Sequence, residues 1–168
     1  MLNLYMIIFY LLMFLSVVSI FVNGLQWIFR FDIYNANYIS FSFVSTLLYM
    51  FTQTLIMFYF IGAGKKVKET ILENDLDKKV YQEVIDLKRK LFGPLTLNML
   101  FVGTAFILGG GVQTKVINKY WHHSIFLIGL IHYIKIIIIQ HSCLISNAQI
   151  LVKVGKDLES SLSNKGVN

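Results

Sequence analysis

All four histidines of the chain, together with Lys135, lie in or beside one apolar stretch with the sequence WHHSIFLIGLIHYIKIIIIQHSC, which runs from Trp121 to Cys143. Histidine binds haem iron and metal ions and transfers protons near neutral pH. A charged side chain at the centre of a membrane-spanning helix costs about 2.5–3.5 kcal/mol on insertion scales, so such residues usually serve a function. His132 and Lys135, near the middle of this stretch, are therefore the first candidates for chemistry.

A haem b site inside a membrane needs two axial ligands that approach one iron from opposite sides. The candidate ligands for haem iron or another metal are His132, His141, His122 and His123. Because one straight helix does not present two of them from opposite sides of an iron, the second ligand would have to come from a methionine, a second copy or a partner. The alternative is a hydrogen bond from His132 to a polar side chain on a neighbouring helix.

His122 and His123 follow Trp121 at the start of the stretch. Adjacent helical residues point about 100° apart, so this pair makes a poor chelate. We expect them to line the membrane interface, with a weak metal-binding or proton-relay role as the alternative.

Depth along the helices suggests which polar residues meet. With a rise of 1.5 Å per residue, the middle of the bilayer falls near His132, Lys135, Gln53 and Thr104. The sequence therefore predicts a midplane polar site at these four residues, and haem b or a quinone is the cofactor that such a site would hold.

Lys135 has no obvious partner in its own chain. All nine acidic residues lie outside the long apolar runs, so no carboxylate of this chain reaches the lysine. Three explanations remain. Lys135 is neutral or extends toward the interface, it meets the anion of a lipid or ligand, or it pairs with a carboxylate of another subunit. In the last case, Lys135, Cys143 and Asn147 are predicted to form a polar stripe at a subunit interface.

The elements that position these residues are membrane spans. The 168-residue chain is 56% hydrophobic and only 14% charged, which is too apolar for a soluble domain. About 20 apolar residues suffice for a helix to cross the bilayer. The sequence predicts an all-α, four-helix integral membrane bundle, a single domain over 1–168 with spans at about 4–29, 41–61, 95–111 and 122–152.

Residues 65–91 are strongly charged but have a helical pattern, which predicts a helical hairpin between the second and third spans. The apolar residues that share one helical face are Val80, Val84, Leu87 and Leu91. Asp77 is the predicted N-cap of the second arm. The hairpin is either a docking surface or a solvated connection.

Positive charge predicts the orientation. The hairpin and the C-terminal tail together carry 11 Lys and Arg residues, whereas the opposite side has Arg30, Lys115 and Lys119. By the positive-inside rule, both termini are cytoplasmic, in a bacterial inner membrane or an equivalent organelle membrane. The formal charge of +6 thus reflects orientation and does not imply nucleic-acid binding.

These residues predict no catalytic set and no self-contained hydrolase or transferase, because no carboxylate stands beside the intramembrane residues. The favoured interpretation is a non-catalytic accessory or assembly subunit of a larger membrane complex, respiratory or otherwise energy-converting. Its partners would be membrane lipids and other membrane subunits, one of which supplies a carboxylate to Lys135. The alternatives are a redox subunit that holds haem b or quinone, and a small oligomeric transporter or channel.

Overall fold

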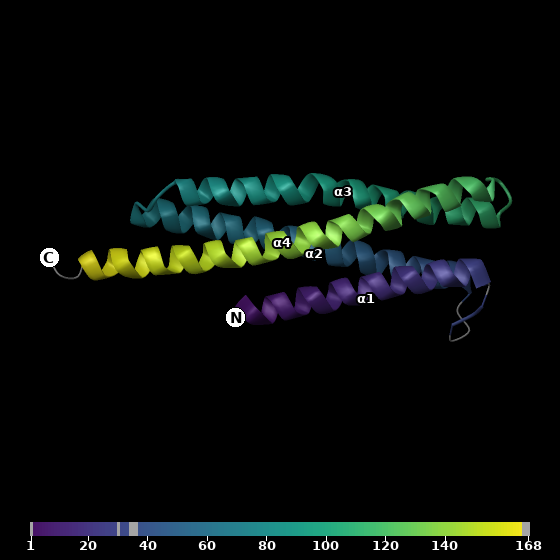
Figure 1. The fold of residues 1–168 in the computed structure, drawn as a ribbon, viewed down its shortest axis with the longest axis horizontal. Helices are drawn as coiled ribbons and strands as arrows, with labels where there is room; N and C mark the ends of the chain where they lie inside the picture. Colours follow the sequence, from purple (N-terminus) through teal and green to yellow (C-terminus); the bar gives the residue numbers. More distant parts are fainter. Residues whose placement is uncertain (1, 30, 34–36, 166–168) are drawn as a thin grey trace. The chain divides into compact units, whose positions relative to one another are not determined.

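A computed structural model describes residues 2–29, 31–33 and 37–165, and Arg30 lies outside these ranges. The described residues form four α-helices (Figure 1). They are α1 (Leu2–Phe29), α2 (Tyr38–Asn74), α3 (Lys79–Gln113) and α4 (Lys119–Lys165). All four are long and apolar enough to cross a membrane. The predictions of an all-helical chain and of four membrane-length helices are therefore confirmed.

The helices extend well beyond the apolar segments. The charged residues 65–74 continue α2, and residues 79–91 begin α3, so that the two helices are joined by a short turn. α3 continues without a break through Gly93 and Pro94. Lysine, glutamate and leucine are good helix formers, which explains why the helices continue where the apolar sequence ends.

The turn between α2 and α3 is capped on both sides. Asp75 has a left-handed backbone with a φ of 52°. The backbone N–H of Leu76 donates to the carbonyl of Ile71 at 3.1 Å, the arrangement that closes a helix C-terminus. Asp77 Oδ1 accepts from the N–H of Lys79 at 2.9 Å, which confirms Asp77 as the N-cap of α3.

The turn between α3 and α4 repeats this design. Lys115 is left-handed with a φ of 60°. The N–H of Val116 donates to the carbonyl of Gly111 at 3.0 Å. Asn118 Oδ1 then accepts from the N–H of Tyr120 at 3.1 Å and caps α4. Local sequence signals thus determine where both long helices end and restart.

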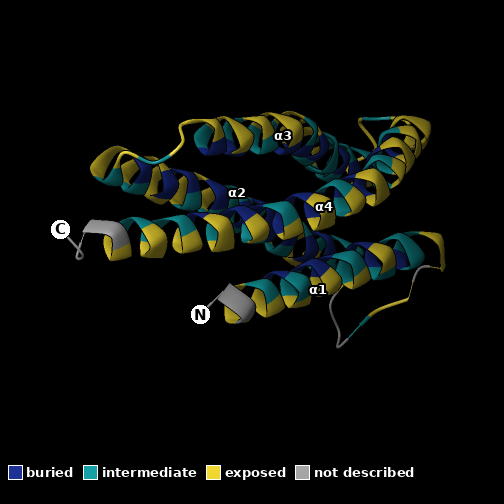
Figure 2. Ribbon diagram, turned by 60° about the vertical axis from the view of Figure 1, so that its left-hand side comes forward, coloured by how far each residue is buried: buried dark blue, intermediate teal, exposed yellow. Residues whose placement is uncertain are grey.

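The chain divides into two compact units. Unit 1 consists of Met1–Leu55 and Pro94–Ile137, and unit 2 of Ile56–Gly93 and Ile138–Asn168. α1 belongs to unit 1, while α2, α3 and α4 each contribute to both units. Along each helix, buried residues follow one side and exposed residues the other (Figure 2).

Unit 2 has its own apolar core, in which the charged hairpin packs against the C-terminal part of α4. The buried members of this core are Val67, Ile71, Val80, Val84, Ile150 and Val154. Leu91 is also fully buried, and Leu87 packs against the core. The predicted apolar face of the hairpin is therefore confirmed.

Charged residues add little to the stability of unit 2. Lys153 Nζ lies 3.3 Å from Glu83 Oε1 and connects α4 to α3, but both side chains are about half exposed. An ion pair in such a position contributes about 0–1 kcal/mol. Apolar packing, with Gly64 of α2 placed closely against Val84 and Lys88 of α3, holds the hairpin together.

Candidate functional site

Polar side chains form a layer inside unit 1. Ser16 Oγ and Thr52 Oγ1 are hydrogen-bonded at 3.0 Å, and both residues are fully buried. Gln53, one of the predicted site residues, is also fully buried. α1 and α2 thus meet through hydroxyl groups as well as apolar contacts, as is common between helices in membranes.

A second buried network joins α2, α3 and α4. Tyr49 Oη donates to Asn98 Oδ1, and Asn98 Nδ2 donates to the carbonyl of Gly129 at 2.9 Å. The rings of Tyr49 and Tyr133 meet edge to face at 5.0 Å between centroids. Sequence reasoning missed these residues, although Asn98 stands out in the apolar run of the third span.

The structure does not bring the four predicted midplane residues into one enclosed site. Gln53 faces the interior, Thr104 and His132 are half-buried, and Lys135 is exposed. The ring of His132 meets the edge of Phe101 at 5.7 Å between centroids.

The side of α4 that faces the interior explains the position of Lys135. Tyr133 and Ile136 are buried on that side. Successive residues turn by about 100°, so Lys135 points well away from both of them. Its neighbours at the surface are Ile131 and Ile134, which are 61% and 58% exposed. The lysine is therefore set in an apolar outer surface of unit 1, and it takes part in no ion pair within the described ranges.

Cys143 and Asn147 differ from Lys135 in their surroundings. Both are completely buried in unit 2. An ideal helix places Cys143 about 80° and Asn147 about 120° around from Lys135, which is too wide for one narrow stripe. Of the three predicted interface residues, only Lys135 is at the surface.

The histidines also occupy different environments. His122 is 2% exposed, whereas His123 and His141 are exposed. His122 shares a hydrogen bond of 3.0 Å between its Nε2 and Tyr38 Oη, and Trp27 Nε1 donates to His123 Nε2. The Trp27 ring lies 4.5 Å from that of His122, centroid to centroid. Among the described residues, no three His, Cys, Asp or Glu side chains gather into a metal site.

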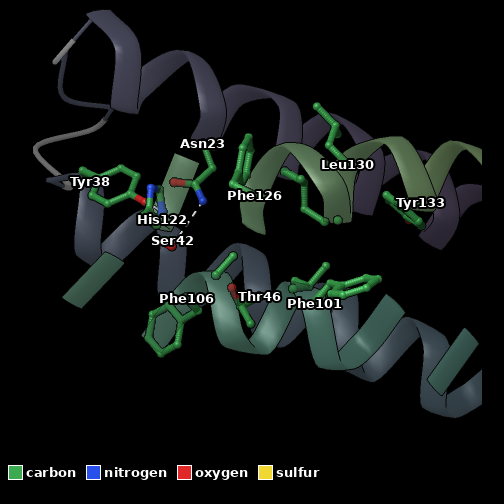
Figure 3. Close-up of a pocket in the computed structure, with 14 residues that line it drawn as sticks. Asn23, Tyr38, Ser42, Thr46, Phe101, Phe106, His122, Phe126, Leu130 and Tyr133 are labelled. Carbon is green, nitrogen blue, oxygen red and sulfur yellow. Dashed lines mark hydrogen bonds between the residues drawn. The ribbon is translucent and has the colours of Figure 1, made fainter. Parts of the chain in front are cut away.

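His122 lines a narrow cavity of about 20 Å³ in unit 1, together with Asn23, Tyr38 and Ser42 (Figure 3). The rest of its wall is mainly apolar, with Phe126 among its residues, but it also includes Thr46 and Tyr133. Asn23 comes from α1, Tyr38 and Ser42 from α2, and His122 from α4. The sequence predicts His122 at the membrane interface, and it contains no signal for a role of Asn23 other than its place as a polar residue near the end of an apolar span.

Fold and site together define a helical protein whose four helices have the length and composition of membrane spans. Compared with protein families, with curated proteins and with solved structures, the chain shows no match. Its most distinctive chemical features are the exposed Lys135 within an apolar surface and the buried polar cavity at His122.

Proposed function

We propose that the chain is a non-catalytic accessory or assembly subunit of a larger membrane complex, in which a carboxylate of another subunit pairs with Lys135. The observation that carries this proposal is the outward position of Lys135 on α4, among the exposed residues Ile131 and Ile134. An outward lysine in an apolar surface is available to a second protein, unlike a lysine inside the bundle.

Lys135 lies too far from either end of the span for its ammonium group to reach water easily. At 1.5 Å per residue, it lies about 24 Å from the start of α4 at Lys119 and about 27 Å from Lys153, the next charged residue. The hydrocarbon core is about 30 Å thick. A four-carbon side chain does not reach across half of that thickness, so pairing with a carboxylate is the favourable way to keep the ammonium charged.

The carboxylate has to come from outside this chain. Every Asp and Glu lies in the charged hairpin, in the C-terminal part or at Asp32, next to the end of the first span. A partner helix with an aspartate or glutamate near its centre would complement Lys135 in both charge and depth.

Removal of the lysine tests this proposal. Lys135→Met should weaken association by about 100-fold, because a carboxylate left unpaired in the membrane costs about 3 kcal/mol. Lys135→Arg should retain the complex, since it keeps the charge. Tagged protein from its native membrane would be measured for co-purifying subunits and for native mass.

Ile131→Met is the matched control, since it alters the same exposed face without removing a charge. Equal recovery of partner subunits with Lys135→Met and with the wild type would contradict the proposal. A Soret band in the purified protein that disappears in His132→Ala would support the redox alternative instead, and flux in liposomes that contain this chain alone would support transport.

The orientation with both termini in the cytoplasm is part of the same proposal, and the excess of Lys and Arg in the hairpin and tail supports it. Lys78 and Val116 are exposed in the turns that follow α2 and α3. In intact cells, a membrane-impermeant maleimide should label Val116→Cys, and should label Lys78→Cys only after permeabilisation. The reverse pattern would contradict this orientation. Native Cys143 is buried and is replaced by alanine in both variants.

A further inference from the structure

Three residues that line the cavity at His122 have a buried polar atom without a hydrogen-bond partner within the described residues. One of these atoms is Tyr133 Oη, and the other two, beside Tyr38 and Ser42, are His122 Nδ1 and Asn23 Oδ1. Both residues are more than nine-tenths buried, at 2% and 7% exposure. Their other polar atoms are satisfied, since Asn23 Nδ2 donates to Ser42 Oγ at 3.2 Å and His122 Nε2 is bonded to Tyr38 Oη. Buried polar atoms are nearly always paired, so these two point to a ligand.

The hydrogen bond to Tyr38 determines what His122 offers. Because an imidazole nitrogen is a better acceptor than a phenol oxygen, we assign Tyr38 Oη as the donor and His122 Nε2 as the acceptor. The proton of the neutral ring is then on Nδ1, which becomes a donor. Asn23 Oδ1 is an acceptor. A hydroxyl group accepts one hydrogen bond and donates another, so its chemistry complements this donor and this acceptor.

The space around these atoms fits a hydroxyl group attached to an apolar body. The inner cavity, at about 20 Å³, has room for one oxygen atom the size of a water molecule. An adjoining groove of about 180 Å³ shares Tyr38, Ser42 and Phe106 with it, and is otherwise lined by Ile39, Ile107 and two glycines. This groove between α2 and α3 is large enough for a ring and is mainly apolar.

Gly109, one of these glycines, keeps the polar end of the site in place. A Cβ atom at this position would lie 3.2 Å from Tyr38 Oη and 3.3 Å from His122 Nε2. The absence of a side chain lets the hydrogen-bonded pair pack directly against α3. The other glycine, Gly110, has open space around it.

We propose that this site binds the hydroxyl head of a membrane-soluble phenol or alcohol, with its apolar body in the adjoining groove. His122 Nδ1 donates to the hydroxyl oxygen, and the hydroxyl donates to Asn23 Oδ1. No bond is broken and no proton is lost, so this is a binding site. It does not depend on the subunit proposed to pair with Lys135.

The matched probes 4-fluorophenol and 4-fluoroanisole test this inference, because the second has no hydroxyl donor. The full chain in lipid nanodiscs would be titrated with each probe and followed by ¹⁹F NMR. We expect saturable binding of the phenol at least about tenfold tighter than that of the anisole, the loss expected for one hydrogen bond. Asn23→Leu should abolish this difference between the probes.

Ser45→Ala is the matched control, since Ser45 is buried on α2 one turn from Ser42 but lies outside the cavity and donates to the carbonyl of Ser19. It should leave binding unchanged. Gly110→Leu places a side chain in the groove, where a Cβ atom meets nothing within 4 Å, and should reduce binding of both probes. This variant tests the site even if Asn23→Leu does not fold.

A ¹⁵N NMR spectrum of the histidine side chains provides a readout that needs no probe. We expect the His122 ring to carry its proton on Nδ1. The ¹⁵N resonance of Nδ1 should shift when the phenol binds. Equal binding of the two probes, unchanged binding in Gly110→Leu, an unprotonated Nδ1, or a long-lived water at Nδ1 that the phenol does not displace would each overturn the proposal.

Discussion

Gly129→Leu is expected to lower the free energy of unfolding by about 3 kcal/mol, a large effect for a single substitution in unit 1. A Cβ atom at Gly129 would lie 3.3 Å from Phe101 Cβ and within 4 Å of the α3 backbone at Phe101 and Val102. Backbone atoms cannot move aside as the end of a flexible side chain can. The larger leucine would therefore force α3 and α4 apart and break the hydrogen bond from Asn98 Nδ2 to the Gly129 carbonyl.

Gly110→Leu is the matched control, because nothing lies within 4 Å of a Cβ atom at Gly110. Since leucine is a better helix former than glycine, this control should be neutral or stabilising by up to about 1 kcal/mol. Unfolding by titration with SDS in mixed micelles, followed by circular dichroism, measures both variants. Equal stability of the two leucine variants would show that α3 and α4 do not pack closely at Gly129.

Asn98→Leu should cost about 2 kcal/mol, because it leaves the buried Tyr49 hydroxyl without its acceptor and removes the side-chain hydrogen bond to the Gly129 carbonyl. Polar interactions between helices in membranes average about 0.6 kcal/mol and reach about 1.7 kcal/mol, so two lost bonds give this magnitude. Tyr49→Phe removes one bond and should cost less than about 1 kcal/mol.

The double variant separates the network from general damage to the core. If Tyr49 and Asn98 are coupled, Tyr49→Phe should have almost no further effect in the Asn98→Leu background. Strictly additive losses in the same SDS titration would mean that the two side chains do not interact. A full double-mutant cycle measures the coupling directly.

The long helices could be predicted from the sequence because local signals specify them. Each predicted span is at least about 17 residues long, which is enough for a helix to cross the bilayer. Asp77 caps α3 as its position in the turn indicated. The buried face that includes Val80, Val84 and Leu91 was readable because the hairpin is amphipathic, with charges around the rest of its surface.

Which side of each apolar helix faces the bundle could not be predicted in the same way. Around Lys135, α4 is apolar on nearly every side, so the sequence contains no contrast that shows which side faces the bundle. Packing of Tyr133 and Ile136 decides this and turns Lys135 outward. Sequence reasoning grouped Lys135 with polar residues that the structure buries, such as Asn147.

The buried networks were missed for a related reason. Tyr49 and Tyr133 count as apolar in a hydropathy profile, although their hydroxyl groups need partners once buried. Asn23 and His122 lie far apart in the sequence, and only the packing of α1 against α4 places them around one cavity. Contacts between distant segments depend on tertiary structure, which local patterns in a sequence do not reveal.

Photo-crosslinking from the outer face of α4 is the most direct measurement for the central claim that Lys135 meets a carboxylate of another subunit. A benzophenone amino acid at Ile131, which is 61% exposed one turn from Lys135, would be activated in native membranes and its adducts identified by mass spectrometry. Leu100 of α3, 64% exposed, serves as the control position. We predict that Ile131 crosslinks to one polypeptide with an Asp or Glu near the centre of a membrane span, and that the adduct is lost in Lys135→Met. Crosslinks from Ile131 to lipid alone, as expected for a face without a protein partner, would contradict the claim.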